Sequence, residues 1–350
     1  MGNTTPGLVD AHHHLYSSLA RGMPAPPVTP TDFRSVLEQI WWRLDLALDL
    51  DMIRAAARLG ALEALLSGTT AIIDHHESPH AIEGSLDVIA DACAEVGVRV
   101  SCAYGVTERH GLDGAMHGLL ENDRFLRRLD RSPDAWGHRR GMVGVHAAFT
   151  CSDYILSAAA GLALEHRVGV HIHVAEGIDD ILAVGRLGDL PTDDWMLIHG
   201  VHLSDDHGLA GTIVHNPRSN MNNAVGYARP TRFANPVALG TDGIGAEMLE
   251  EFRLAYARLR ESDVTASPEI AWAWLEQGWV LFPEAREDEV TWSSDQVDDP
   301  WRLAFTTGVH PLEVRIGGDL VLADGQPTRV DAEEIRAHAA EQATRLFAAL

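Results

Sequence analysis

The sequence Val-Asp-Ala-His-His-His at residues 9–14 ends a short apolar run near the beginning of the chain. Side chains alternate in direction along a strand, so His12 and His14 share one face while His13 points to the other. Two imidazoles two residues apart at a strand end can bind one metal ion. The turn that follows is rich in histidine rather than glycine, which argues against the first turn of a doubly wound open sheet.

Similar β-branched runs recur along the chain and alternate with longer amphipathic stretches. We expect strands near residues 8–13, 70–74, 98–104, 141–146, 168–174, 195–199, 211–215 and 236–240. We expect helices at residues 52–66, 81–96, 153–167 and 178–187, with Ser152 capping the third. Strands that alternate with helices pair in parallel through right-handed crossovers, so this order predicts an α/β fold, a (β/α)8 TIM-type barrel.

The end of the chain departs from the barrel pattern. We expect three parts: a barrel over 1–258, a helix around 268–280 and an acidic loop within 259–313, and an appendage over 314–350. Residues 314–330 predict a β-hairpin that turns at Asp324–Gly325, and Asp331 with Glu334 forms a capping box for a last helix that packs on the barrel. We expect that helix, or a second subunit of a homodimer, to cover the exposed edge of the hairpin.

The charge and cysteine content exclude several classes of partner. The 350 residues include 51 acidic and 27 basic side chains, a formal net charge of −24, and every basic side chain is arginine. Nucleic acids and anionic membranes are polyanions, so we expect neither as a partner and expect a small-molecule substrate instead. The three cysteines have no metal-binding spacing and no apolar run reaches the roughly 18 residues of a membrane span, which is typical of a cytoplasmic protein.

Residues with metal-binding or proton-transfer chemistry close the later strands. His173 lies at the end of strand five and Glu176 follows it, His199 ends strand six, and Asp242 follows strand eight. The active site of a barrel lies at the carboxyl ends of its strands, so we expect these side chains to meet. A carboxylate at Glu176 can move a proton between water and a leaving group, and Asp242 can bind a metal and orient water. Each motif alone also fits ordinary loop chemistry.

The combined motifs resemble the amidohydrolase superfamily, in its deaminase and chlorohydrolase branch. They are HxH, HxAE, a histidine after strand six, HNPxSN and GTDG. The stretches IWWRLD, SGTTAIIDHHESP and HNPRSNMNNAVGYA are similar to aminohydrolases linked to selenium metabolism. The resemblance covers residues 6–255 and 314–350. Relatives usually carry several dozen residues before HxH, which form half of a small β-sandwich, so we expect that satellite domain to be reduced to the hairpin.

The resemblance implies a role for each matching residue. The metal ligands are His12, His14, His173 and Asp242; the catalytic residues are Glu176 as proton shuttle, His199 beside the reacting water or developing alkoxide, and Asp242; the residues near the substrate are His76, His146 and Asn220. For the last three, packing or supporting polar groups remain an equal alternative. Trp41, Trp42 and Arg218 are further candidates for lining the pocket.

Neutral imidazoles and one carboxylate suit a divalent metal ion, Zn²⁺ or alternatively Fe²⁺. Two-metal members of the superfamily commonly bridge their ions through a carbamylated lysine. This chain has no lysine. We therefore expect one ion per chain, with a glutamate-bridged pair as the alternative.

The resemblance implies a hydrolase that acts on a non-peptide C–N bond of a small nitrogenous compound, by hydrolytic deamination. The same site could instead carry out dechlorination, dealkylamination or cyclic-amide hydrolysis, and the sequence does not separate these reactions. A third hypothesis is a non-catalytic protein that binds a metal or a partner.

Overall fold

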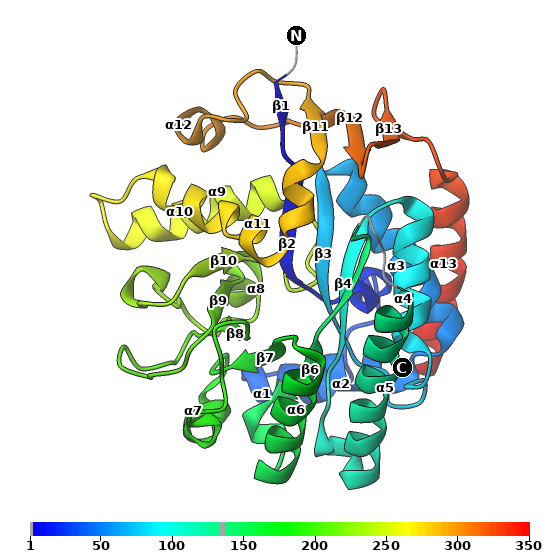
Figure 1. Ribbon diagram of the computed structural model, residues 1–350, viewed down its shortest axis with the longest axis vertical. Coiled ribbons are helices and arrows are strands. Elements are labelled where there is room, and N and C mark those ends of the chain that lie inside the picture. Colours follow the sequence, from blue (N-terminus) through cyan, green and yellow to red (C-terminus); the bar gives the residue numbers. More distant parts are fainter. Residues whose placement is uncertain (1–2, 133–136) are drawn as a thin grey trace.

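Two parallel sheets supply the strands at the centre of the molecule (Figure 1). The computed structural model describes residues 3–132 and 137–350. The first sheet has the order β2-β3-β4-β5, with bounds Leu8–His13, Thr69–His76, Arg99–Tyr104 and Arg139–Gly141. The second has the order β10-β9-β8-β7-β6, with bounds Val237–Leu239, Thr212–His215, Met196–His199, Val170–Val174 and Val143–Ala147.

Hydrogen bonds join the two sheets at both edges. Met142 alone separates β5 from β6, and its amide donates to Cys102 O at 3.0 Å. At the other edge the amides of Thr241 and Asp242 donate to His12 O at 3.0 and 2.9 Å, beside β2. The fold is the predicted TIM-type barrel, and each predicted strand range overlaps an observed strand.

The interior of the barrel is apolar at the amino ends of the strands and polar at the carboxyl ends. A buried cluster contains Val9 and Ala11 of β2 with Ala71 and Ile73 of β3, together with side chains of β8, β9 and β10. Side chains of one strand face alternate in steps of two, so His75 follows Ala71 and Ile73 on the inner face. Imidazoles therefore lie directly beyond the apolar layer.

Helices surround the strands (Figure 1). The longer ones are α3 (Leu50–Leu66), α4 (Ser85–Val96), α5 (Gly111–Arg131), α6 (Asp153–His166), α9 (Met248–Ser262) and α13 (Ala332–Ala349), which packs against α3. Shorter ones are α1 (Phe33–Val36), α2 (Trp42–Ala47), α7 (Ile181–Val184), α8 (Pro217–Asn222), α10 (Pro268–Glu276), α11 (Gly278–Leu281) and α12 (Pro300–Leu303). A π-helical turn, Leu37–Trp41, joins α1 to α2.

Three of the predicted helices differ from the observed ones. The helix expected around 268–280 is divided at Gln277 into α10 and α11. The helix expected over 81–96 begins only at Ser85, because Gly84 has a left-handed φ of 82°. The helix expected over 178–187 is broken into 3₁₀ turns on either side of α7. Ser152 caps α6 as predicted, since its Oγ accepts from the amide of Ile155 at 3.4 Å.

A five-stranded antiparallel sheet lies at one end of the barrel (Figure 1). Its order is β1-β11-β12-β13-β14, with bounds Thr4–Thr5, Glu289–Trp292, Pro311–Ile316, Asp319–Ala323 and Gln326–Pro327. The expectation of a solvated acidic loop is wrong for Glu289–Trp292, because Val290 and Trp292 are fully buried. The expected hairpin contains two turns, at Gly317–Gly318 and at Asp324–Gly325. The sheet thus takes strands from all three expected parts of the chain.

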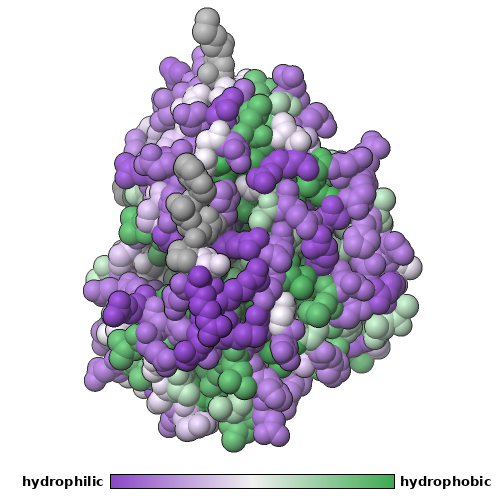
Figure 2. Space-filling view, turned by 45° about the vertical axis from the view of Figure 1, so that its right-hand side comes forward, coloured by the Kyte–Doolittle hydropathy of each residue, from purple (hydrophilic) through white to green (hydrophobic). Residues whose placement is uncertain are grey.

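The surface is predominantly hydrophilic on the face shown in Figure 2, where hydrophobic side chains form separate patches. Within residues 3–132 and 137–350, no helix combines the length and the apolar character that a membrane crossing requires.

Candidate active site

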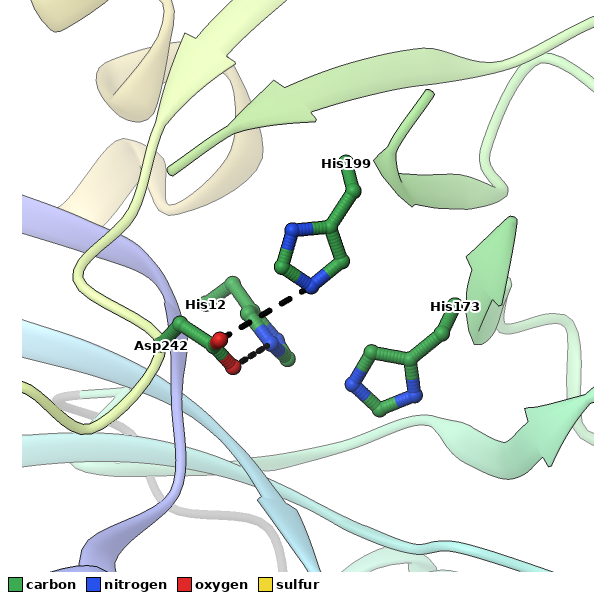
Figure 3. Close-up of side chains that lie close together, drawn as sticks. All are labelled: His12, His173, His199 and Asp242. Atoms are coloured by element: carbon green, nitrogen blue, oxygen red, sulfur yellow. Dashed lines mark hydrogen bonds and ion pairs between the residues drawn. The ribbon is translucent and has the colours of Figure 1, made fainter. Parts of the chain in front are cut away.

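Four side chains from separate strand ends meet at the carboxyl end of the barrel (Figure 3). One ligand-type atom from each of His12, His173, His199 and Asp242 lies within 4.8 Å of the others. His12 Nε2 is 2.9 Å from Asp242 Oδ1, and His199 Nε2 is 3.8 Å from Asp242 Oδ2. In Figure 3, His173 faces the same space from β7.

His14 also reaches this cluster. Its Nε2 lies 3.1 Å from Asp242 Oδ1 and 3.3 Å from His173 Nε2. The structure therefore brings together all of the residues predicted as ligands, with His199 beside them. His13 points elsewhere, and its Nδ1 contacts Asp10 and Thr241. Simple alternation from Val9 and Ala11 would turn His13 inward, but the register of β2 shifts between Asp10 and His13, so His12 and His14 face the site instead.

In each predicted histidine ligand, a hydrogen bond at Nδ1, the nitrogen turned away from the cluster, holds the ring in its orientation. His14 Nδ1 donates to His75 O at 2.6 Å, and His173 Nδ1 donates to His146 O at 2.7 Å. A carbonyl only accepts, so each ring keeps its Nε2 lone pair toward the shared centre. His12 Nδ1 lies 2.9 Å from His171 Nε2, which allows the same arrangement.

This donor set fits a divalent metal ion. Burial lowers the pKa of His12 and of His173, so both rings are neutral near pH 7. Burial lowers the pKa of His14 as well, but the hydrogen bond and the charge of Asp242 outweigh it and raise that pKa, so the cluster favours a positive charge between its nitrogens and its carboxylate. Neutral imidazole nitrogens with one carboxylate oxygen are a common ligand set for Zn²⁺.

The backbone is left-handed at three positions of this site. Ala175, His199 and Asp242 have φ values of 48°, 73° and 58°. Residues other than glycine rarely adopt such angles, and they do so where the surrounding structure holds them. These turns at the strand ends determine where the adjacent functional side chains point.

Glu176 lies at the edge of the cluster. Its Oε2 is 3.4 Å from His199 Nε2, and its Oε1 accepts from Asn223 Nδ2 at 3.5 Å. Burial, and then the charge of Asp242, raise the pKa of Glu176 well above its usual range. His199 Nδ1 donates to Asn220 Oδ1 at 2.8 Å, which leaves Nε2 toward Glu176 and Asp242. The pair can therefore exchange protons with a group bound between them.

A pocket opens onto this cluster. Its walls include the aromatic side chains of Phe33, Trp41, Trp42 and Phe149, and its polar lining includes His146, Glu176 and Asp242. Trp41 and Trp42 lie where the sequence suggested. Arg218 pairs with Glu250 and Glu251 instead.

Of the three residues predicted near the substrate, only His146 lines the pocket among the described residues. Its Nδ1 contacts Thr150 Oγ1 at 2.8 Å. His76 contacts Ser78 Oγ at 2.9 Å behind the wall, and Asn220 supports His199.

Sequence reasoning missed two histidines and a charged group at the pocket. His75 lies with its ring centre 4.7 Å from that of His173, and neither of its nitrogens has a hydrogen-bond partner among the described residues. His171 contacts His12. Two-residue alternation along β3 and β7 was the signal that could have found both. The carboxylates of Asp45 and Glu77, which accept from Arg109, also line the pocket. They lie in the stretches IWWRLD and SGTTAIIDHHESP, but neither stretch predicts the contact with Arg109.

The chain is similar to known proteins in sequence and in fold. The sequence profile described as the amidohydrolase family matches residues 3–274. A 5′-deoxyadenosine deaminase of Methanopyrus kandleri is 28% identical and aligns with 97% of this chain and 86% of its own length. An 8-oxoguanine deaminase of Pseudomonas aeruginosa is 30% identical over 78% of this chain and 68% of its own length. An adenosine deaminase structure from Xanthomonas campestris with bound zinc has a TM-score of 0.81 at 19% identity, covering 99% of this chain and 86% of that one, and this likeness concerns the fold.

Proposed function

Since the chain belongs to the amidohydrolase family, as its motifs predicted, we propose that it is a metal-dependent aminohydrolase acting on an aminated purine or a related heterocycle. The reaction would replace an exocyclic amino group by oxygen from water and release ammonia. The observation that carries this proposal is the position of Glu176 Oε2, 3.4 Å from His199 Nε2, beside the cluster of imidazoles and Asp242.

We propose that His12, His14, His173 and Asp242 hold one Zn²⁺ ion. Their convergence and the orientation of the Nε2 lone pairs support this set. When bound, such an ion would lower the pKa of a water molecule toward neutrality. A carbamylated-lysine bridge to a second ion is impossible, because the chain has no lysine.

The side chains around that position would then move the protons. Glu176 would accept a proton from water at Oε2 and donate it to the departing amino nitrogen. Its raised pKa keeps the protonated form accessible near neutral pH. His199 Nε2, whose lone pair faces the site because Nδ1 donates to Asn220, would accept a hydrogen bond from the attacking water and so position its oxygen. The aromatic walls of the pocket suit a planar substrate.

Ammonia release with matched variants tests this function. Zinc-loaded protein is assayed with 5′-deoxyadenosine and 8-oxoguanine, and metal per chain is measured by elemental analysis. We expect Glu176→Gln to lower kcat by roughly 10²–10⁴-fold, the usual contribution of a proton-transfer group, and to keep one zinc per chain. The control is Glu341→Gln on the exposed face of α13, which should change neither quantity. Full activity in Glu176→Gln would refute the assignment.

We also propose that the protein works in the cytoplasm, without a nucleic-acid partner and as a homodimer. The net charge of −24 supports the exclusion of nucleic acid, and three buried free cysteines support a reducing compartment. Light scattering at micromolar concentration tests the homodimer, and a monomer would contradict it.

A further inference from the structure

The chain reaches Glu176 through a strained turn. Ala175 stands between β7 and Glu176 with a φ of 48°. An L-residue with a Cβ adopts this region only when its surroundings hold it there. Two hydrogen bonds do so, because the Ala175 amide donates to Asp180 Oδ2 at 2.6 Å and Ala175 O accepts from the His202 amide at 2.9 Å.

Asp180 ties this turn to a second loop of the site. Its Oδ1 accepts from the amide of Phe149 at 3.2 Å, in the segment that follows β6. Asp180 is 3% exposed, so the two amides face a carboxylate that is almost shielded from water. Arg186 lies near but donates to Ala148 O and Cys151 O and pairs with Asp153. Both carboxylate oxygens of Asp180 therefore accept hydrogen bonds from backbone amides.

The other side of the turn is also confined. A Cβ built on Gly177 would lie 2.6 Å from Phe33 Cδ1, so the ring of Phe33 packs directly against the backbone after Glu176. Asp180 holds the residue before Glu176, and Phe33 limits the residue after it. The direction of the Glu176 side chain is thus set by its two neighbours in the chain.

We propose that Asp180 is a positioning residue, which holds Ala175 in its left-handed conformation and thereby keeps the Glu176 carboxyl beside His199. This inference rests on the proposed function of Glu176 as the proton shuttle. Asp180 also lines the pocket. Direct contact with the substrate is therefore the competing role that an experiment must exclude.

Asp180→Asn tests the proposal, because asparagine can accept one amide bond through Oδ1 while its Nδ2 opposes the other amide. We expect kcat to fall about 10- to 100-fold, with KM within about twofold and zinc content unchanged, as misplacement of a catalytic group predicts. The matched control is Asp331→Asn at the start of α13, where one carboxylate also accepts two backbone amides. That variant should keep full kcat.

Ala175→Gly supplies the rescue, since glycine populates positive φ without a steric penalty. We expect the double variant Asp180→Asn/Ala175→Gly to recover kcat to within about threefold of Ala175→Gly alone. Ala175→Val, with Asp180 intact, should lower kcat as Asp180→Asn does, because a β-branched residue resists this conformation. It also tests the proposal if Asp180→Asn does not fold.

Hydrogen exchange separates this inference from the proposed function. In zinc-loaded protein we expect Asp180→Asn to speed exchange of the Ala175 and Phe149 amides at least tenfold, whether or not a purine is turned over. Absence of ammonia release by the wild type would refute the function alone. The positioning role would be overturned by unchanged exchange, by no rescue in the double variant, or by a rise in KM at constant kcat.

Discussion

His12 differs from the other predicted imidazole ligands in what holds its ring. Backbone carbonyls fix His14 and His173, whereas His12 Nδ1 faces the imidazole of His171 at 2.9 Å. His171 is fully buried and burial lowers its pKa to about 3, so it is a neutral acceptor. Partners of this kind orient a metal ligand and raise its basicity.

His171→Phe should therefore weaken metal binding. The substitution removes the acceptor for His12 Nδ1 and keeps a ring of similar size, so we expect the zinc dissociation constant to rise about 10- to 100-fold. Competition with a chromophoric chelator measures it. His310→Phe, at an exposed position outside the barrel, is the control and should leave the constant unchanged. Equal affinity in both variants would show that His12 does not need this partner.

At the scale of single residues, most of the candidate site was predictable, because each predicted ligand belongs to a short motif near a strand end. His12, His14, His173 and Asp242 each lie at a strand end or within three residues of one, and the barrel brings strand ends together. The sequence analysis does not predict His75 at the site, although this residue shares the inner face of β3 with Ala71 and Ile73. The charged group of Asp45, Glu77 and Arg109 joins distant segments, and no spacing in the sequence announces such a contact.

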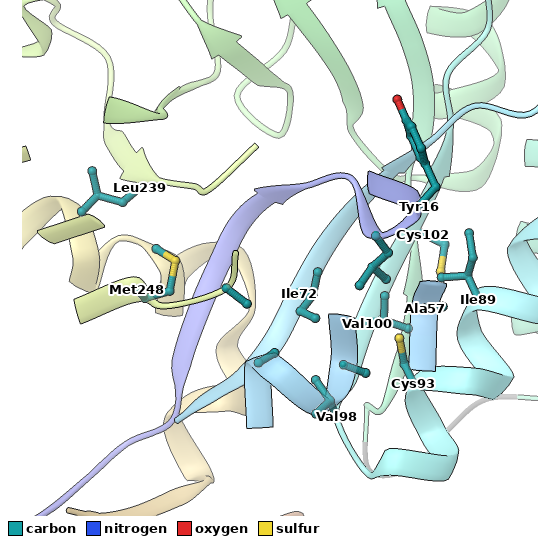
Figure 4. Close-up of a cluster of buried hydrophobic side chains, with 14 of the residues drawn as sticks. Tyr16, Ala57, Ile72, Ile89, Cys93, Val98, Val100, Cys102, Leu239 and Met248 are labelled. Carbon is teal, nitrogen blue, oxygen red and sulfur yellow. The ribbon is translucent and has the colours of Figure 1, made fainter. Parts of the chain in front are cut away.

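At the scale of elements, long amphipathic helices were predictable and short strands were not. Ile89 and Cys93 of α4 pack toward Ile72 and Val100 on the outer face of the barrel, which is a helical spacing readable in the sequence (Figure 4). Strand β11 has only four residues in an acidic stretch, with buried side chains at Val290 and Trp292. Its alternation is too short to outweigh the surrounding charge.

A buried ion pair fastens the small sheet to the barrel. Arg99 of β4 donates to both carboxylate oxygens of Asp288, at 2.9 and 2.7 Å, just before β11. Asp288 also accepts from the amide of Gly317 at 3.0 Å, in the turn after β12. Both charged residues are 2% exposed, so removal of one leaves the other charge buried.

Asp288→Ala should lower the free energy of unfolding by about 3–5 kcal/mol, the cost of breaking a buried pair. Urea unfolding of zinc-loaded protein, followed by circular dichroism, measures the change. The control is Glu313→Ala, which breaks the exposed pair between Glu313 and Arg315 and should cost less than about 1 kcal/mol. Similar losses of unfolding free energy in the two variants would mean that other groups stabilise the charge of Arg99 when Asp288 is absent.

At the scale of the whole molecule, burial shifts histidines and acids in opposite directions. The buried histidines with a lowered pKa are His12, His75, His76, His146, His171, His173, His199 and His215. Burial raises the pKa of Asp180 to about 7 and that of Glu251 to about 8. In both classes burial disfavours the charged form. The free energy of unfolding should therefore decrease both at acidic pH, where unfolded histidines bind protons, and at alkaline pH, where unfolded acids have lost them.

The sign of each contribution predicts a maximum of stability near pH 6.5. Below that pH the histidines of the unfolded chain become protonated, whereas the buried histidines of the folded chain stay neutral. The free energy of unfolding therefore falls as pH falls. Each histidine with a strongly lowered pKa contributes a loss of about 1 kcal/mol between pH 6.5 and 5.5. From about pH 4 up to their raised pKa values the folded acids retain protons that the unfolded acids have lost, so their contribution to stability falls as pH rises. Above pH 6.5 the histidines no longer offset this fall, so stability decreases toward pH 8. The net charge of −24 adds repulsion in the same direction.

Urea unfolding of metal-free protein between pH 5 and 8.5 tests this profile, because the absence of metal removes the separate effect of metal binding. Glu251→Gln should flatten the alkaline side by about 1–2 kcal/mol, since the amide cannot ionise next to Arg218. The acidic side should keep its slope in that variant, because the histidines that cause it are unchanged. A stability that rises steadily to pH 8.5 would show that Arg218 keeps Glu251 ionised throughout, and that the pair is a conventional buried ion pair.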